Sequence, residues 1–425
     1  MTSHAAAILD VALLGAMERY GDLCMNAVID LKRGFDRAAI ERAVERTIEA
    51  FPVLGARYET NWWRDRWVPI AGPASDAIHF EPSGMDDGGV EARTAAWVRA
   101  PIDPTRERPI RVVAIERGAG MRLILSLLHI AVDGAGVAAV GHVFGAHLYG
   151  VSPALPTGGP RGLLGALGGL KWFHLPVLAR GLATTTLRPL LHWLAAPRTS
   201  AYPSEPGAPA VWRTTVVPRE DIERARARCG GVTVNDVLVA VFARVAASRS
   251  QEKNVVVSYT IDLRRYGKEP RLVAANTSSV MSAILPRDAL GTLESAARAA
   301  ALATRQDRDR LYGPALVLGP TLLGAIVPHV VARGIIPLVG SAAVDVPLDR
   351  GMAFTNVGRI DDGLRAFGED IENIRIIGPR TTGTTIPIVV AFGFRGALHL
   401  EMYVGPGIGM EVLEVIEQEI LDAMK

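Results

Sequence analysis

The sequence predicts a mixed α/β protein of two domains, and three observations support this. A chain of 425 residues is longer than the usual single core. Segments with the periods of helices and of strands follow one another along both halves. Residues 197–209, PRTSAYPSEPGAP, hold four prolines among small polar residues, which is typical of a linker. We therefore expect an N-terminal domain at 1–200 and a C-terminal domain at 201–425.

The first half combines helices with pairs of strands. Residues 36–50 have apolar side chains at helical spacing, Asp36 stands where an N-cap is needed, and Pro52 follows the last turn. Residues 53–70 are rich in aromatic and β-branched side chains, which predicts two strands around a turn near Arg64. The remaining predicted elements of this half are a helix at 90–100, strands at 110–117 and 121–130, and a helix at 137–150.

The second half has the same mixed character. Residues 231–248 predict a buried helix that either Thr233 or Asn235 caps. Residues 254–265 form a nearly continuous apolar run, typical of a strand buried on both faces. The other predicted elements are strands at 211–218, 280–286, 352–360, 384–394 and 397–404, and helices at 219–229 and 410–424.

Charge and cysteine content exclude several classes of function. The 46 Lys and Arg nearly balance the 44 Asp and Glu, and no long run of like charge is present, so we expect no nucleic-acid partner. The two cysteines, Cys24 and Cys229, form no CxxC pair, and His142 and His147 are five residues apart, off the spacing that places two ligands on one helix face. We therefore expect no disulfide framework and no metal site.

Two long apolar tracts, residues 163–195 and 314–344, raise the question of a membrane. Four prolines, His329 and Arg333 interrupt the second tract, so we expect no transmembrane span. The tracts are candidates for a tunnel wall, a cover over substrate or a surface in peripheral contact with a membrane. The N-terminus lacks the basic start of a signal peptide, and we expect a cytoplasmic protein.

The stretch LLHIAVDGAG, residues 127–136, lies where a predicted strand turns into a helix. A general base needs an imidazole held in one orientation at the mouth of a cleft, and His129 ends the strand. Asp133 is placed to fix the turn or to meet an arginine, and Gly134 leaves room for substrate or backbone to approach. Taken alone, the stretch is equally compatible with a core histidine beside an ordinary turn.

The same stretch resembles the HxxxDG motif of the acyltransferase superfamily of chloramphenicol acetyltransferase, nonribosomal condensation domains, plant alcohol acyltransferases, wax ester synthases and mycobacterial polyketide-associated acyltransferases. Further segments resemble that superfamily in its own order over nearly the whole chain. GVTVNDVLVAVFARV is similar to its Thr-x-Asn-Asp helix, YTIDLRRYG with AANTSSVM to its Asp-x-Arg strand and asparagine turn, and FTNVGRI to its Ser-Asn-x-Gly strand.

The resemblance implies two sandwich subdomains similar to chloramphenicol acetyltransferase, which meet in a V with the active-site tunnel between them. His129 would be the general base, and Asp133 would have a structural role in an ion pair with Arg264 or Arg265. It also implies that three polar residues line the tunnel or act as oxyanion donors: Asn276, Thr355 and Asn356. The alternative is that they only cap strand ends.

One departure from the superfamily bears on the reaction. Condensation domains commonly carry two adjacent histidines, whereas Leu128 precedes His129 here. Together with the lack of an adenylation or carrier segment, this favours O-acylation over N-acylation by a free-standing, monomeric enzyme. The donor would be acyl-CoA or a phosphopantetheinyl thioester on a carrier protein, with no bound cofactor, and the acceptor a small or lipophilic alcohol or amine. The alternatives are an amide-forming, condensation-like enzyme and a non-catalytic protein that docks carriers.

Overall fold

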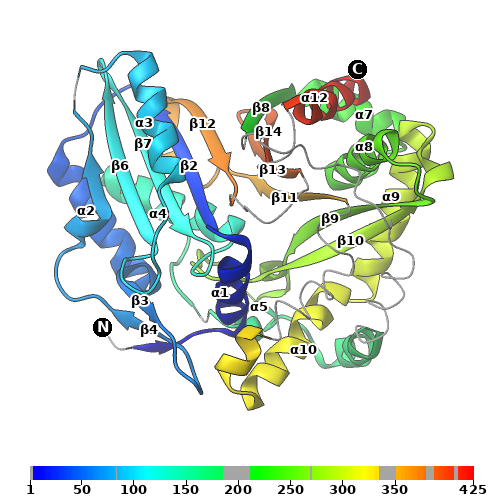
Figure 1. Cartoon of the computed structure of the whole chain (residues 1–425), viewed down its shortest axis with the longest axis horizontal. Helices are drawn as coiled ribbons and strands as arrows, with labels where there is room; N and C mark the ends of the chain where they lie inside the picture. Colours follow the sequence, from blue (N-terminus) through cyan, green and yellow to red (C-terminus); the bar gives the residue numbers. More distant parts are fainter. Residues whose placement is uncertain are drawn as a thin grey trace.

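The computed structural model confirms a mixed α/β architecture, built from two large sheets that lie side by side (Figure 1). The predicted linker at 197–209 and the last part of the second apolar tract, 335–344, lie outside the described residues. The structure describes residues 3–82, 84–159, 161–184, 211–268, 270–334, 351–379, 387–405 and 410–425.

A five-stranded sheet forms the centre of the first half, with antiparallel neighbours except for one parallel pair, β5 with β6. In spatial order its strands are β12 (Ile371–Ile377), β2 (Cys24–Leu31), β7 (Gly120–Leu128), β6 (Ile110–Arg117) and β5 (Ile78–Phe80). Apolar side chains of α2 (Arg37–Ala50) and α4 (Gly134–Leu148) pack on one face. The opposite face packs against α3 (Asp87–Arg99).

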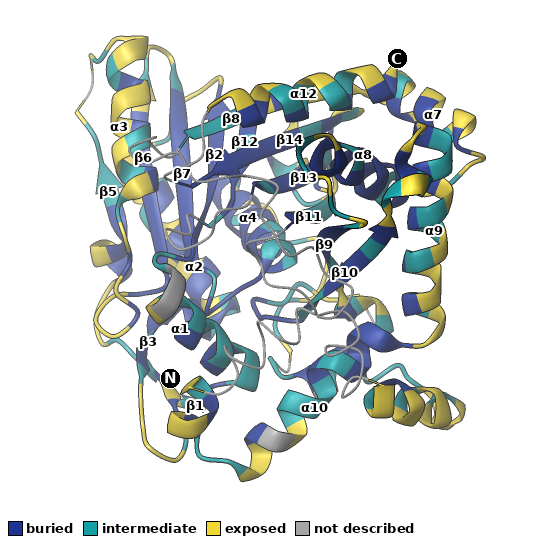
Figure 2. Ribbon diagram, turned by 45° about the vertical axis from the view of Figure 1, so that its right-hand side comes forward, coloured by how far each residue is buried: buried dark blue, intermediate teal, exposed yellow. Residues whose placement is uncertain are grey.

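A six-stranded sheet organises the second half. Its strands, in spatial order, are β10 (Ser278–Pro286), β9 (Asn254–Asp262), β11 (Met352–Arg359), β13 (Ile388–Phe394), β14 (Ala397–Val404) and β8 (Val211–Pro218). One face is covered by α7 (Arg219–Arg228), α8 (Val234–Arg249), α9 (Leu293–Asp309) and α12 (Met410–Met424). Figure 2 shows the outer sides of α7, α9 and α12 exposed and their inner sides buried, while α8 is buried over most of its length. The other face contributes Val390, Phe392 and Phe394 to the core of the first half.

A small third sheet lies below the first half, beside the apolar helices. It consists of β1 (His4–Ala5), β4 (Arg66–Pro69) and β3 (Ala56–Glu59), with α1 (Ile8–Tyr20), α5 (Leu163–Ala166) and α10 (Tyr312–Ile326) nearby. Short 3-10 helices connect the larger elements: η1 (Pro52–Gly55), η2 (Ala74–Ala77), η3 (Trp172–His174), η4 (Leu263–Tyr266), η5 (Arg287–Leu290) and η6 (Arg365–Asp370).

Two helices, α2 and α8, begin at caps that the sequence predicted. The Oδ1 of Asp36 accepts a hydrogen bond from the Ala39 amide at 2.6 Å, as expected for α2. Thr233 rather than Asn235 caps α8, and its Oγ1 accepts from the Asp236 amide at 3.2 Å. The helix after the HxxxDG stretch begins at Gly134, three residues earlier than predicted, because Asp133 caps it.

The second apolar tract folds as separate helical pieces. Within the described residues, α10 ends at Ile326 and a further helical stretch, 329–334, follows Pro328. None of the helices that the structure describes combines the length and apolar character needed to cross a bilayer.

The edge strand β12 was not predicted, and it joins the two halves. It belongs to the second half of the sequence, yet it pairs antiparallel with β2, with Ile377 opposite Asn26. The segment before it is anchored by Phe367, whose ring fills the space that a side chain at Gly145 would occupy. The division at residue 200, and the V with a tunnel at its junction, stay predictions.

Candidate active site

The HxxxDG stretch forms a tight turn between β7 and α4. The His129 amide donates to the Leu23 carbonyl at 3.0 Å, and Asp133 Oδ1 accepts from the Gly136 amide at 2.8 Å, which caps the helix. A Cβ on Gly136 would lie 3.0 Å from the Cβ of Val132, whereas one on Gly134 would be in ordinary contact with Val357 at 3.4 Å. The crowded glycine of the turn is therefore Gly136, while Gly134 faces β11.

Asp133 is clamped by an arginine from the second half of the chain. Its side chain is buried, with 1% of the residue exposed, and Arg264 donates to both carboxylate oxygens, from Nη1 at 3.0 Å and from Nη2 at 2.9 Å. The Thr277 amide donates to Oδ2 at 2.8 Å. Arg264 also donates to the Ala275 carbonyl at 2.9 Å. Of the two arginines considered from the sequence, Arg264 is the one that meets Asp133.

Both members of this pair stay charged. Burial by itself would raise the pKa of Asp133, but the charge of Arg264 and the hydrogen bonds that the carboxylate accepts outweigh it and hold that pKa below its ordinary value. Burial likewise opposes the charge of Arg264, and the charge of Asp133 reverses the effect, so the pKa of the guanidinium is raised. The turn after His129 is thus fixed by a buried, bidentate ion pair.

A second buried network holds the backbone of the turn, and sequence analysis missed most of it. Asn276 Nδ2 donates to the Ile130 carbonyl at 2.8 Å and to Asp10 Oδ1 at 3.2 Å. Arg161 donates to the Ala131 carbonyl at 2.9 Å and to Asp10 Oδ2 at 2.9 Å. Asp10 is fully buried. A carboxylate within a mostly apolar helical segment was the feature of the sequence that could have revealed this network. Asn276 therefore supports the turn directly.

His129 lies half-buried at the start of the turn. Its Nδ1 is buried and has no hydrogen-bond partner among the described residues. The hydrogen bonds of the Asp133 carboxylate go to Arg264, Thr277 and Gly136, so Asp133 does not pair with this imidazole. The arrangement differs from a catalytic triad, in which an aspartate holds the histidine.

Thr355 and Asn356 of β11 have different surroundings. Thr355 Oγ1 lies 2.7 Å from Thr260 Oγ1, and a Cβ on Gly134 would lie 4.0 Å from it, so Thr355 faces the turn. Asn356 Nδ2 donates to Asn235 Oδ1 at 2.6 Å, and its Oδ1 accepts from the Gly358 amide at 2.9 Å. Asn356 therefore links β11 to the start of α8.

Glu401 is a buried carboxyl group on the same sheet that the sequence did not reveal. Strand register places it opposite Val390, which is opposite Thr355. Its Oε2 accepts from Thr214 Oγ1 at 2.8 Å, and its buried Oε1 has no partner within the described chain. Burial raises the pKa of Glu401 to about 7, although the Thr214 hydroxyl and the charge of Arg375 act in the opposite direction.

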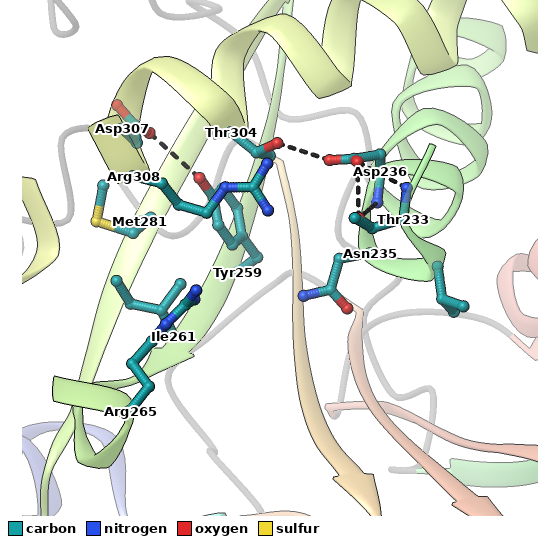
Figure 3. Close-up of a pocket in the computed structure, with 11 residues that line it drawn as sticks. Thr233, Asn235, Asp236, Tyr259, Ile261, Arg265, Met281, Thr304, Asp307 and Arg308 are labelled. Atoms are coloured by element: carbon teal, nitrogen blue, oxygen red, sulfur yellow. Dashed lines mark hydrogen bonds between the residues drawn. The ribbon is translucent and has the colours of Figure 1, made fainter. Parts of the chain in front are cut away.

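A pocket of about 280 Å³ opens at the N-terminus of α8, next to the clamp (Figure 3). It includes Arg265, the neighbour of Arg264, together with Arg308 and Asn235. Figure 3 shows these three side chains directed towards the open middle of the pocket. Within the described residues, neither Arg265 nor Arg308 forms an ion pair. Two free guanidinium groups beside a helix N-terminus favour an anionic ligand.

The two carboxylates that line this pocket accept hydrogen bonds from neighbouring side chains and backbone. Asp236 Oδ2 accepts from the amide and hydroxyl of Thr233, and its Oδ1 accepts from Thr304. Asp307 accepts from the Tyr259 hydroxyl at 3.2 Å. Elsewhere in the described chain, no group of three or more His, Cys, Asp or Glu side chains is arranged to hold a metal ion.

Sequence comparison identifies no relative, because no protein-family model and no curated protein matches this chain. Solved structures do match it over its whole length. A trichothecene 15-O-acetyltransferase from Fusarium sporotrichioides has a TM-score of 0.74 at 12% identity, covering 99% of this chain and 95% of the other. Polyketide synthase associated protein 5 from Mycobacterium tuberculosis has a TM-score of 0.65 at 15% identity, covering 99% of both chains.

A third match is the starter condensation domain of rhizomide synthetase, solved as a point mutant in complex with C8-CoA. Its TM-score is 0.69 at 15% identity, and the alignment covers 100% of this chain and 94% of the other. The chain thus has the fold shared by this acetyltransferase, the polyketide synthase associated protein and the condensation domain. At this level of identity the likeness concerns the fold alone, and it confirms the mixed α/β fold class that the sequence resemblance implied.

The Asp133–Arg264 pair predicts a large stability effect. Asp133→Asn should lower the free energy of unfolding by about 3–5 kcal/mol, because it leaves the buried charge of Arg264 without its partner. Asp262→Asn is the matched control, since Asp262 also contacts Arg264, at 3.1 Å, but is 46% exposed. Urea unfolding followed by circular dichroism measures both. A native midpoint for Asp133→Asn with lost activity would argue for a direct chemical role instead.

Glu401 predicts a dependence of stability on pH. Its carboxyl group stays protonated in the folded protein up to about pH 7, while the unfolded chain ionises near the ordinary value of 4.5. The unfolded state therefore binds fewer protons in this interval, and the wild type loses stability as pH rises through it. Glu401→Gln has no carboxyl group to ionise and avoids this loss. The difference in unfolding free energy between Glu401→Gln and wild type should therefore change by roughly 3 kcal/mol in favour of the variant from acid to mildly basic pH.

Chemical unfolding across that pH range checks the gain. The exposed Glu414→Gln serves as the control and should track the wild type at every pH. A constant offset between Glu401→Gln and wild type would show that the carboxyl group ionises normally in the folded state.

Proposed function

We propose that this protein is an acyltransferase that moves an acyl group from a thioester to a hydroxyl or amino group of an acceptor, with His129 as general base. The observation that carries the proposal is the position of His129. It stands at the turn between β7 and α4, and that turn is locked by an ion pair from the other half of the chain. A turn held from both halves presents the imidazole in one orientation, as general-base catalysis needs.

The reaction follows from this placement. His129 takes the proton of the acceptor O–H or N–H group as the oxygen or nitrogen forms a bond to the thioester carbonyl carbon. The C–S bond then breaks, and the imidazolium returns the proton to the thiolate, which leaves as a thiol. Because Nδ1 of His129 is buried, Nε2 is the nitrogen assigned to this proton transfer. Thr355, which faces the turn, is proposed to line the reaction space.

Leu128 supports O-acylation over amide formation. Its side chain is fully buried in the main core of the first half, so a second imidazole has no place beside His129. A single base is sufficient for a hydroxyl acceptor, which loses one proton, whereas an amine that arrives as an ammonium group has to lose two. A small or lipophilic alcohol is therefore the preferred acceptor, and a monomeric cytoplasmic enzyme remains the working expectation.

The arginine pocket supports a phosphorylated thioester donor. Coenzyme A and the phosphopantetheine arm of a carrier protein both carry phosphate at the end of the pantetheine chain opposite the thioester, and Arg265 and Arg308, neither of which forms an ion pair in the described residues, supply positive charge to bind it. The rhizomide synthetase domain was solved with C8-CoA, which is consistent with this class of donor. We assign the phosphate of the donor to this pocket.

His129→Ala should lower the rate of acyl transfer by about 10²–10⁴-fold, because the acceptor then keeps its proton as it attacks. Release of free thiol from a panel of acyl-CoA thioesters, with and without alcohols and amines, measures the rate. His147→Ala is the control, since His147 lies on α4 away from the turn.

Three outcomes of that assay would contradict the proposal. Unchanged turnover in His129→Ala removes the general base. Equal loss in His147→Ala points to damage to the fold. Binding of thioesters by the wild type with no thiol release for any acceptor would identify a carrier-docking or binding protein instead of an enzyme.

Arg308→Ala should raise the KM for acyl-CoA about tenfold and leave the KM for an acyl N-acetylcysteamine thioester unchanged, since the short donor has no phosphate. The exposed Arg305→Ala on the same helix is the matched control. Steady-state rates of thiol release at varied concentrations of each donor give the two KM values. An equal effect on both donors would show that Arg308 acts on the fold or on the reacting atoms.

A further inference from the structure

The exposed large apolar side chains of the described residues are concentrated in a few short segments. Of the fifteen large hydrophobic side chains exposed in the described residues, ten come from three segments: 62–63, 172–177 and 322–331. Several are far more exposed than is usual for their type, with Trp172 at 81%, Ile326 at 73% and Trp62 at 69%. Single exposed hydrophobic residues are ordinary, but a cluster of this kind marks an interaction surface.

Backbone hydrogen bonds bring the first and third segments together. The His329 amide donates to the Trp63 carbonyl at 2.9 Å, and the Val330 amide donates to the Trp62 carbonyl at 3.4 Å. Arg64 donates to the Val327 carbonyl at 2.8 Å and lies over the Trp63 ring at 4.5 Å. The turn between β3 and β4 is therefore fixed beside the end of α10.

The second segment adjoins the same helix. Residues 175–184 are helical and pack against α10, where Gly181 closely approaches Ala315 and Gly319 leaves room for Leu182. Figures 1 and 2 both place α10 on the lower side of the molecule, and Figure 1 shows β3 and β4 of the small sheet on that side too. We call this side the apolar face and define it by six residues: Trp62, Trp63, Leu322, Ile326, Val330 and Val331.

Basic side chains predominate around the apolar face, although Glu59, which is 45% exposed, lies opposite Arg66 in the β3–β4 pairing. Residues 171–184 and 312–334 contain no Asp or Glu. The one carboxylate in the β3–β4 turn, Asp65, is fully buried and lies 3.7 Å from Arg333. Arg66, Lys171 and Arg180 are exposed. Aromatic and aliphatic side chains bordered by basic groups are the combination that binds an anionic lipid surface.

We propose that the apolar face docks this protein on the surface of an anionic lipid bilayer. Its tryptophans and aliphatic side chains enter the boundary between headgroups and acyl chains, while Arg66, Lys171 and Arg180 contact the lipid phosphates. The contact is peripheral and does not depend on the acyl-transfer activity. A second copy of this chain is a poor occupant, because a symmetric dimer through this face would bring basic groups against basic groups.

Vesicle co-sedimentation of the full chain tests the proposal, with phosphatidylcholine vesicles compared with vesicles that also contain phosphatidylglycerol. The wild type should bind the anionic vesicles and lose binding as salt is raised. The double variant Trp62→Ser/Trp63→Ser, or Ile326→Ser, should weaken binding about tenfold or more. These side chains are exposed, so thermal unfolding and thiol release should match the wild type.

Leu302→Ser is the matched control, because Leu302 is 61% exposed on α9, outside the apolar face. It should bind vesicles as the wild type does. Failure to bind either vesicle, equal binding to neutral and anionic vesicles, or an equal defect in Leu302→Ser would each overturn the proposal. So would a concentration-dependent dimer by light scattering that the Trp62/Trp63 variant dissociates, since the occupant would then be a second copy.

Discussion

The candidate site depends on a buried ion pair that joins the two halves of the chain. Asp133 ends the turn after His129, and Arg264 follows a strand of the other sheet, so their bidentate contact sets the position of one half relative to the other. Such a pair is costly to form, since two charges leave water, and costly to break, since a lone charge then stays buried. This contact fixes the backbone turn that follows His129, and the arginine pocket includes Arg265, the neighbour of Arg264.

The same constraint explains how polar groups are distributed around the turn. Asn276 and Arg161 bind the carbonyl groups of Ile130 and Ala131, and both also bind Asp10. Side chains from outside β7 and α4 therefore hold the backbone of the turn. The chemistry of the site is simple, with one imidazole, while the surrounding structure that fixes it is extensive.

Local patterns allowed much of the fold to be predicted from sequence. Periodicity and capping identified α2 and α8, and apolar runs identified β6, β7 and β9, because these signals act within a few residues. The ordered motifs indicated that Asp133 would meet an arginine, but only tertiary geometry distinguishes Arg264 from its neighbour. Strand β12 escaped prediction because its partner, β2, lies in the opposite half of the chain. Asp10, Arg161 and Glu401 escaped for the same reason, since their partners are distant in sequence.

Strand β12 also affects how the chain reaches its folded state. On the ribosome, residues 24–31 are made early, yet the strand that completes their sheet ends at Ile377. Until then β2 has an open edge, and an unpaired edge strand is a template for association with other chains. Several strands of the second sheet are synthesised while that edge stays open, so the first half is unlike an autonomous cotranslational folding unit. The sheet of the first half is thus complete only after a late part of the second half has been synthesised.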